Sequence, residues 1–292
     1  MSRRFSCADI ANGYWLPRRL LLVRHGESAA NVDRTLYSRV PDWKIPLTER
    51  GRVQAFECGR RLRSIIKDEK LYIYYSPYAR TRQTLDEVRK SLLPSQVQGE
   101  REDERLREQE IGNFQPLDKM DEMWAERNEF GRSYYRFPNG ESSVDVGDRV
   151  SKFFDSLFRE RVELSSLSAQ NDMRGSSGGG ARPLLMRDFD DHNVVIISHG
   201  LLIRLFIGRW YSAPMEVFET MKNPPNCGIV VLERHDEGRL VMTDISKRLF
   251  GSDPLLEMMK FDGEDNIQLC RHMFAEGRYS SSPSMEDGTG VE

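Results

Sequence analysis

Short apolar runs alternate along the chain with longer segments in which apolar residues recur every three or four positions. The runs at residues 19–24, 71–75 and 193–198 predict strands, and the last is apolar enough to be buried on both faces of a parallel sheet. Residues 228–234 and 239–245 predict an antiparallel pair that turns at 236–238. Helical spacing predicts helices over residues 48–66, with Thr48 as the cap, and over 80–92, 142–160 and 201–210.

The alternation of strands and helices predicts an α/β fold. We expect a three-layer sandwich with a mostly parallel central sheet and helices on both faces. One domain is predicted over residues 19–273, after an N-terminal extension of residues 1–18. The Ser/Gly-rich residues 165–183 predict a flexible insertion in this domain, and residues 274–292 predict a disordered tail.

Composition excludes several classes of partner. The 292 residues are 38% hydrophobic, and 43 basic against 46 acidic side chains give a net charge of -3, which favours neither nucleic acid nor an anionic membrane. No apolar run approaches the ~18 residues that a membrane helix needs. The four cysteines lie far apart and lack zinc-site spacing, so we expect reduced thiols and a cytoplasmic protein. The oligomeric state stays open between monomer and dimer.

Charged and polar residues follow three of the predicted strands. The segment RHGES follows the first at residues 24–28, Ser76 and Arg80 follow the second, and SHG follows the third at 198–200. The carboxyl ends of parallel strands lie at one edge of a sheet, where α/β proteins bind their ligands. Cations gathered there repel one another unless a bound anion or nearby carboxylates neutralise them. The pattern therefore predicts a site for a phosphate group.

Five blocks of sequence, in the same order, resemble those of the histidine phosphatase superfamily, which is also called phosphoglycerate mutase-like. Together they span residues 19–234, and a set of five ordered blocks is far more specific than the tripeptide RHG alone. The blocks are LVRHGES, SPYARTRQT, LREQEIG, PNGES followed by Arg149, and ISHGLLIR.

The resemblance implies a metal-independent phosphomonoesterase that works through a phosphohistidine and needs no cofactor. His25 would attack phosphorus as a neutral nucleophile, while a backbone carbonyl holds its other ring nitrogen. Arg24, Arg80 and His199 would stabilise the charge of the transferring phosphoryl group. Glu108 would protonate the leaving group and then activate water, which requires a raised pKa.

The resemblance also implies which residues bind the substrate, a small phosphorylated metabolite. Gly26 would let the backbone approach the phosphate closely because it has no side chain. Specificity is expected from loops around residues 33–46 and 113–140. No metal site is expected, because the acidic cluster before His192 lacks a second histidine at ligand spacing. The predicted binding set is Arg24, Gly26, Ser28, Asn31, Arg80, His199 and Gly200.

Two other functions remain open from the sequence. Cofactor-dependent mutases of the family carry a Trp-Asn pair where this chain has Ala30-Asn31, and a tyrosine where it has Ile111. These departures make a phosphoglycerate-type mutase the second candidate. The third is a catalytically weak phosphate-binding scaffold, but the chain retains every core residue of the family pattern, which argues against it.

Overall fold

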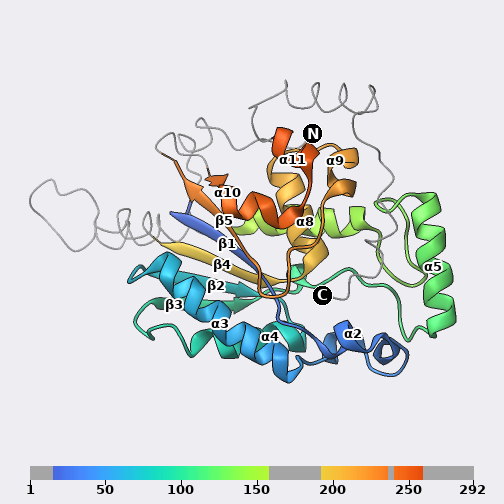
Figure 1. Ribbon diagram of the computed structural model, residues 1–292, viewed down its shortest axis with the longest axis horizontal. Helices are drawn as coiled ribbons and strands as arrows, with labels where there is room; N and C mark the ends of the chain where they lie inside the picture. Colours follow the sequence, from blue (N-terminus) through green and yellow to red (C-terminus); the bar gives the residue numbers. More distant parts are fainter. Residues whose placement is uncertain (1–15, 158–191, 236–239, 259–292) are drawn as a thin grey trace, which may run out of the picture.

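A six-stranded sheet forms the centre of the protein (Figure 1). The computed structural model describes residues 16–157, 192–235 and 240–258. In the order β3-β2-β4-β1-β5-β6, the first four strands run parallel, β5 is antiparallel to β1, and β6 is antiparallel to β5. The predicted mostly parallel sheet is confirmed. The strands are β1 (Arg19–Arg24), β2 (Leu71–Tyr75), β3 (Val97–Glu102), β4 (Asn193–Ser198), β5 (Ile229–Arg234) and β6 (Leu240–Met242).

Helices cover both faces of the sheet because successive side chains of a strand point to opposite sides. Leu21 and Val23 of β1 share one apolar cluster with α3 (Glu49–Ile66) and α4 (Ala79–Arg89). Their neighbours Leu20 and Leu22 join a second cluster, formed with the helix over residues 143–157, α8 (Gly200–Trp210) and α9 (Met215–Thr220). Figure 1 shows α3 and α4 below the sheet and α8 and α9 above it. The three-layer architecture is therefore as predicted.

The helices begin close to the predicted positions. Thr48 caps α3, since its Oγ1 accepts a hydrogen bond from the backbone N–H of Gly51 at 2.9 Å. The helix predicted over 142–160 is described as far as residue 157. None of the helices in the described ranges has the length and apolarity needed to cross a membrane.

One edge strand and one long helix were not predicted. The edge strand β3 reads VQGERE, which has no apolar alternation, and its parallel pairing with β2 makes it a strand. The helix α5 (Leu117–Phe130) lies within residues 113–140, so the expectation of a loop there is wrong. It packs through Met120 and Met123 in a small cluster of its own, beyond the carboxyl ends of the strands (Figure 1).

Short helical turns complete the described chain. They are α2 (Ala29–Val32), η1 (Arg34–Ser38), η2 (Asp42–Lys44), η3 (Glu104–Leu106), α10 (Asp244–Lys247), η4 (Arg248–Phe250) and α11 (Asp253–Met258). The predicted insertion at 165–183, the turn at 236–238, the tail at 274–292 and residues 1–15 of the extension lie outside the described residues.

Candidate active site

His25 follows β1 at the carboxyl edge of the sheet and is only 4% exposed. Its Nδ1–H donates to the carbonyl oxygen of Gly26 at 2.6 Å, so a backbone carbonyl holds this nitrogen and Nε2 keeps its lone pair. Burial, with the charges of Arg80 and Arg24 as further causes, lowers the pKa of His25 well below its usual value. The imidazole is therefore neutral at pH 7, which is the form that can attack an electrophile.

The loop before β5 fixes the end of β1. The backbone N–H of Cys227 donates to the carbonyls of Arg24 at 3.1 Å and His25 at 3.2 Å. The side-chain amide of Asn226 donates to the same His25 carbonyl at 3.1 Å, and Arg24 Nη1 donates to the Pro224 carbonyl at 2.8 Å. These contacts fix the position of His25 relative to that of Arg24. No sequence pattern predicts these contacts, because they join segments about two hundred positions apart.

Arg80, in the first turn of α4, is 3% exposed and pairs with Asp42 of η2. Its Nη1 donates to Asp42 Oδ1 at 2.7 Å and to the Asp42 carbonyl at 2.9 Å, and its Nη2 donates to Oδ2 at 3.2 Å. The ring of Tyr78 lies 4.8 Å from the guanidinium carbon. Asp42 was not singled out from the sequence, yet its carboxylate supplies the counter-charge that a buried arginine requires.

His199 follows β4 and lies beside His25, with 5.2 Å between the ring centroids. Its Nε2 shares a hydrogen bond of 2.8 Å with the hydroxyl of Ser76, which follows β2. Burial, and then the charge of Arg80, lowers the pKa of His199 well below its usual value. Three strand ends thus bring their polar residues to one place at the edge of the sheet.

Glu108 lies in an irregular segment after η3. Burial is the largest influence on its pKa and raises it, whereas the backbone N–H of Gln109, which donates to Oε1 at 3.1 Å, and the charge of Arg80 lower it. The net direction is upward, as a proton donor requires. Burial lowers the pKa of Arg24, and the charge of the Glu108 carboxylate partly opposes this shift, so the two groups are close enough to interact electrostatically.

Ser28 and Asn31, which were predicted to contact phosphate, contact each other. The backbone N–H and the hydroxyl of Ser28 donate to Asn31 Oδ1 at 2.9 and 3.0 Å. Asn226 donates to the same oxygen at 3.4 Å, which links Asn31 to the end of β1.

The two glycines of the predicted binding set lie against protein atoms. A Cβ on Gly26 would come within 2.4 Å of the Gly51 carbonyl oxygen, and one on Gly200 within 2.7 Å of Asn223 Cγ. Packing alone therefore requires glycine at position 26, where the neighbouring atoms are backbone, whereas at position 200 the neighbour is the end of a side chain that can shift. The close approach of Gly26 to a phosphate remains a prediction.

Two further arginines, the buried Arg127 of α5 and the half-buried Arg204 of α8, were given no role from the sequence. Burial lowers the pKa of each to about 10, and the charges of Glu108 and Arg24 act on Arg204. Arg204 also donates to the Met221 carbonyl. Within the described ranges, the Nε atom of neither arginine has a hydrogen-bond partner. These two arginines add positive charge on the side of the site that faces α5.

This arrangement has the parts needed for phosphoryl transfer, namely a neutral imidazole, buried guanidinium groups and a carboxyl group with a raised pKa. No set of three or more His, Cys, Asp or Glu side chains that could hold a metal ion occurs in residues 16–157, 192–235 and 240–258.

Known proteins similar to this chain include both phosphatases and mutase-like proteins. The phosphoglycerate mutase-like protein AT74H of Arabidopsis thaliana is 42% identical over 227 residues, which are 75% of this chain and 74% of that protein. The broad-range acid phosphatase DET1 of Saccharomyces cerevisiae is 25% identical, over 74% of this chain and 85% of its own.

The comparison of structures supports the same fold. The structure of YhfR from Bacillus stearothermophilus superposes with a TM-score of 0.54 at 23% identity, covering 79% of this chain and 97% of that one. The family model of the histidine phosphatase superfamily (branch 1) matches residues 20–165 and 181–244. With most of the described chain matched in this way, the protein belongs to branch 1 of the histidine phosphatase superfamily.

Proposed function

We propose that the protein is a phosphomonoester hydrolase that forms a phosphohistidine on His25, needs no metal ion and acts on a small phosphorylated metabolite. The state of His25 carries this proposal. Its ring is neutral, its Nδ1 is bound to the Gly26 carbonyl, and the buried cations Arg24 and Arg80 act on it. A cytoplasmic location belongs to the proposal and is supported by the free buried thiols of Cys58 and Cys227.

The reaction has two steps. In the first, His25 Nε2 forms a bond to phosphorus, the bond from phosphorus to the leaving oxygen breaks, and Glu108 gives its proton to that oxygen. In the second, water attacks phosphorus, Glu108 takes a proton from the water, and the P–N bond breaks to release inorganic phosphate. Arg24, Arg80 and His199 stabilise the charge on the equatorial oxygens in both steps.

The test is hydrolysis of 4-nitrophenyl phosphate in the presence of a chelator. Wild type should turn over, and His25→Ala should lose at least about 10³-fold in kcat/KM because the nucleophile is gone. His235→Ala, which removes an exposed histidine, is the matched control and should keep full activity. No turnover by wild type would instead support the phosphate-binding scaffold, and loss of activity in the chelator would refute the metal-free mechanism.

A phosphoglycerate-type mutase is the second candidate, because bisphosphoglycerate-dependent mutases also occur among the relatives, for example one of Bartonella henselae that is 28% identical over 59% of this chain. A mutase returns the phosphoryl group to an organic substrate, whereas a phosphatase passes it to water. Incubation with 3-phosphoglycerate and a bisphosphate primer distinguishes the two, since a mutase yields the 2-isomer and the proposed phosphatase yields free phosphate.

We further propose that the substrate carries a second anionic group, a carboxylate or another phosphate. Arg127 and Arg204 support this, since the Nε atom of each is buried and has no partner in the described part of the chain. A screen of phosphorylated metabolites should then show lower KM values for esters with a second negative group than for neutral sugar phosphates. Equal KM values in the two groups would contradict this choice of substrate class.

A further inference from the structure

Glu108 has no regular secondary structure to fix its position. It lies between η3 and α5, and its own side chain receives a hydrogen bond only from the adjacent Gln109 among the contacts of the described residues. A general acid must be held close to its productive position to transfer a proton efficiently. Other residues must therefore hold the backbone of this segment.

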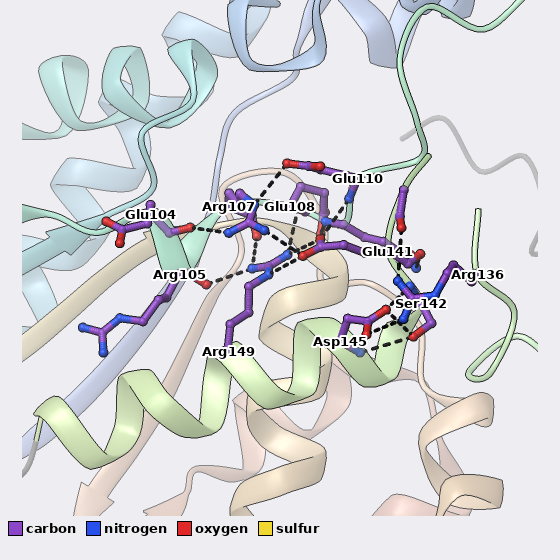
Figure 2. Close-up of polar contacts among 12 residues, drawn as sticks. Glu104, Arg105, Arg107, Glu108, Glu110, Arg136, Glu141, Ser142, Asp145 and Arg149 are labelled. Carbon is purple, nitrogen blue, oxygen red and sulfur yellow. Dashed lines mark hydrogen bonds and ion pairs between the residues drawn. The ribbon is translucent and has the colours of Figure 1, made fainter. Parts of the chain in front are cut away.

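Arg149 holds that backbone from below (Figure 2). It projects from the helix over residues 143–157, is 7% exposed, and donates hydrogen bonds to three backbone carbonyls of the segment. Nη1 donates to the carbonyls of Arg105 at 2.8 Å and Arg107 at 2.6 Å, and Nη2 donates to the carbonyl of Glu108 itself at 3.0 Å. The guanidinium thus fixes the backbone on both sides of the acid and at the acid.

Glu141 completes the contact from the other side. Its two carboxylate oxygens accept from Arg149 Nε at 3.0 Å and Nη2 at 2.8 Å, which brings all five N–H groups of Arg149 into hydrogen bonds. The same carboxylate accepts from Arg107 Nη2 at 2.8 Å and from the Glu110 backbone N–H at 3.1 Å.

Backbone contacts tie the two segments together as well. The Glu141 N–H donates to the Glu110 carbonyl at 2.8 Å, and Gln109 Nε2 donates to the Glu141 carbonyl at 2.9 Å. Every residue from 107 to 110 therefore contacts Glu141 or Arg149. Neither of these two residues donates to or accepts from the carboxyl group of Glu108, so their hydrogen bonds reach the acid only through its backbone. The charge of Arg149 also acts on the Glu108 carboxyl, as a smaller influence than burial on its pKa.

We infer that Glu141 and Arg149 are positioning residues, which act through the backbone of residues 105–110 to aim the Glu108 carboxyl at the leaving oxygen. The inference rests on the proposed phosphatase function. It assigns a catalytic purpose to a buried ion pair, although such pairs contribute little to net stability on average. Arginine is required because lysine offers no planar fork that can reach three carbonyls and a carboxylate.

The leaving group provides a readout that a structural role would not affect. An acid speeds P–O cleavage most when the departing oxygen is strongly basic, and little when it leaves readily as an anion. Phenyl phosphate and 4-nitrophenyl phosphate have similar shapes but leave as a more and a less basic phenolate. The value of kcat/KM reports the steps up to this cleavage, so it excludes the later attack of water.

The experiment compares kcat/KM for the two esters in wild type, Glu108→Gln and Glu141→Gln. Glu108→Gln should lose about 10²-fold with phenyl phosphate and much less with 4-nitrophenyl phosphate. Glu141→Gln should show the same difference between the two esters, but a smaller one. We expect kcat/KM to fall at least about tenfold with phenyl phosphate and under about threefold with 4-nitrophenyl phosphate. Arg149→Lys should resemble Glu141→Gln rather than wild type, and activity on 4-nitrophenyl phosphate shows that the variants are folded.

Asp145→Asn is the matched control. It breaks the ion pair of 2.6 Å between Asp145 and Arg136 near the same helix end. The asparagine amide oxygen can still accept the two hydrogen bonds that Asp145 Oδ2 receives at 2.7 Å from the backbone N–H and the hydroxyl of Ser142. In the described structure Asp145 does not contact residues 105–110 (Figure 2). Its ratio of the two kcat/KM values should equal that of wild type. If Glu108→Gln is selective and Glu141→Gln slows both esters equally, the positioning role is refuted while the phosphatase proposal stands. If wild type hydrolyses neither ester, the phosphatase proposal itself fails.

Discussion

At the scale of single residues, Asp42 acts on two groups of the site at once. Its carboxylate pairs with the buried guanidinium of Arg80, and its charge adds to the burial that raises the pKa of Glu108. The charge of Arg80 has the opposite effect on Glu108 and lowers that pKa. Asp42 therefore neutralises the cation that would otherwise favour ionisation of the acid. One carboxylate thus compensates the charge of the arginine and raises the pKa of the acid.

This dual role predicts the behaviour of Asp42→Asn. Proton donation by Glu108 is lost as pH rises through its pKa, so kcat/KM for phenyl phosphate should fall on the alkaline side. Removing the Asp42 charge lowers the pKa of Glu108, and this fall should therefore begin at a lower pH. At a pH above both midpoints the variant should be several-fold slower than wild type. A pH profile of kcat/KM measures the change.

Asp121→Asn serves as the control for this profile, because the Asp121 side chain is 72% exposed and, among the described residues, pairs only with Arg34. Its alkaline midpoint should match that of wild type. A midpoint of Asp42→Asn that stays in place or moves to higher pH would contradict the role given to Asp42.

The sequence predicts some of these residues and misses others for a physical reason. His25, Arg80 and His199 stand directly after or near strands, where the topology of an α/β sheet itself directs side chains to one edge. Asp42 reaches Arg80 across 38 positions through an irregular loop, and Asn226 reaches His25 across 201. No local periodicity encodes where such a loop comes to rest, so these contacts require the structure.

At the scale of elements, the end of β1 and the first turn of α3 pass unusually close to each other. A Cβ on Gly51 would lie 2.1 Å from the Glu27 carbonyl oxygen, and one on Gly26 would lie 2.4 Å from the Gly51 carbonyl oxygen. The backbone N–H of Thr48 donates to the Glu27 carbonyl at 2.9 Å at the same crossing. The helix therefore supports the segment that carries the nucleophile, and glycine is required on both sides.

Gly51→Ala should consequently destabilise the protein and slow catalysis. The added methyl group must displace backbone atoms, which costs about 1–3 kcal/mol, and it displaces the segment next to His25. Urea unfolding and kcat on 4-nitrophenyl phosphate measure the two effects. Gly147→Ala is the control, because nothing lies within 4 Å of its Cβ position and alanine favours a helix interior by about 0.5–1 kcal/mol. Stability unchanged in Gly51→Ala would show that the crossing has room to relax.

The edge strand β3 and the long helix α5 were not predicted, because neither packs on the sheet in the ordinary way. β3 lies at the edge, where solvent reaches it and no apolar alternation is needed. The helix α5 buries Met120, Met123 and Arg127 against a small separate cluster rather than the main core, so its apolar stripe is short. In contrast, α3, α4 and α8 bury long stripes and were predicted close to their observed limits. The short helix α9 buries only Val217 and Phe218 and was not predicted.

At the scale of the whole molecule, a chain with a net charge of -3 gathers buried cations at one edge of its sheet. The parallel order of β2, β4 and β1 makes this possible, because these three strands end side by side. The alternation of strands and helices predicts a layered sheet but not the order of its strands, which depends on how the layers pack. The cationic edge is thus a property of the assembled fold rather than of its composition.

Such an edge should bind inorganic phosphate and stabilise the folded state. A ligand that binds only the folded protein adds about 2.7 kcal/mol at one hundred times its dissociation constant, which corresponds to a rise in Tm of roughly 5–10 °C for a protein of this size. Arg80→Gln should lose most of this rise, because it removes one of the two guanidinium groups that we propose to bind the phosphate. Arg63→Gln is the control for nonspecific anion binding, since Arg63 lines a basic surface pocket with Arg60 and Lys90. Thermal unfolding in phosphate and in chloride of equal ionic strength measures the difference. An equal rise in Tm in both variants would show that the anion binds away from the strand ends.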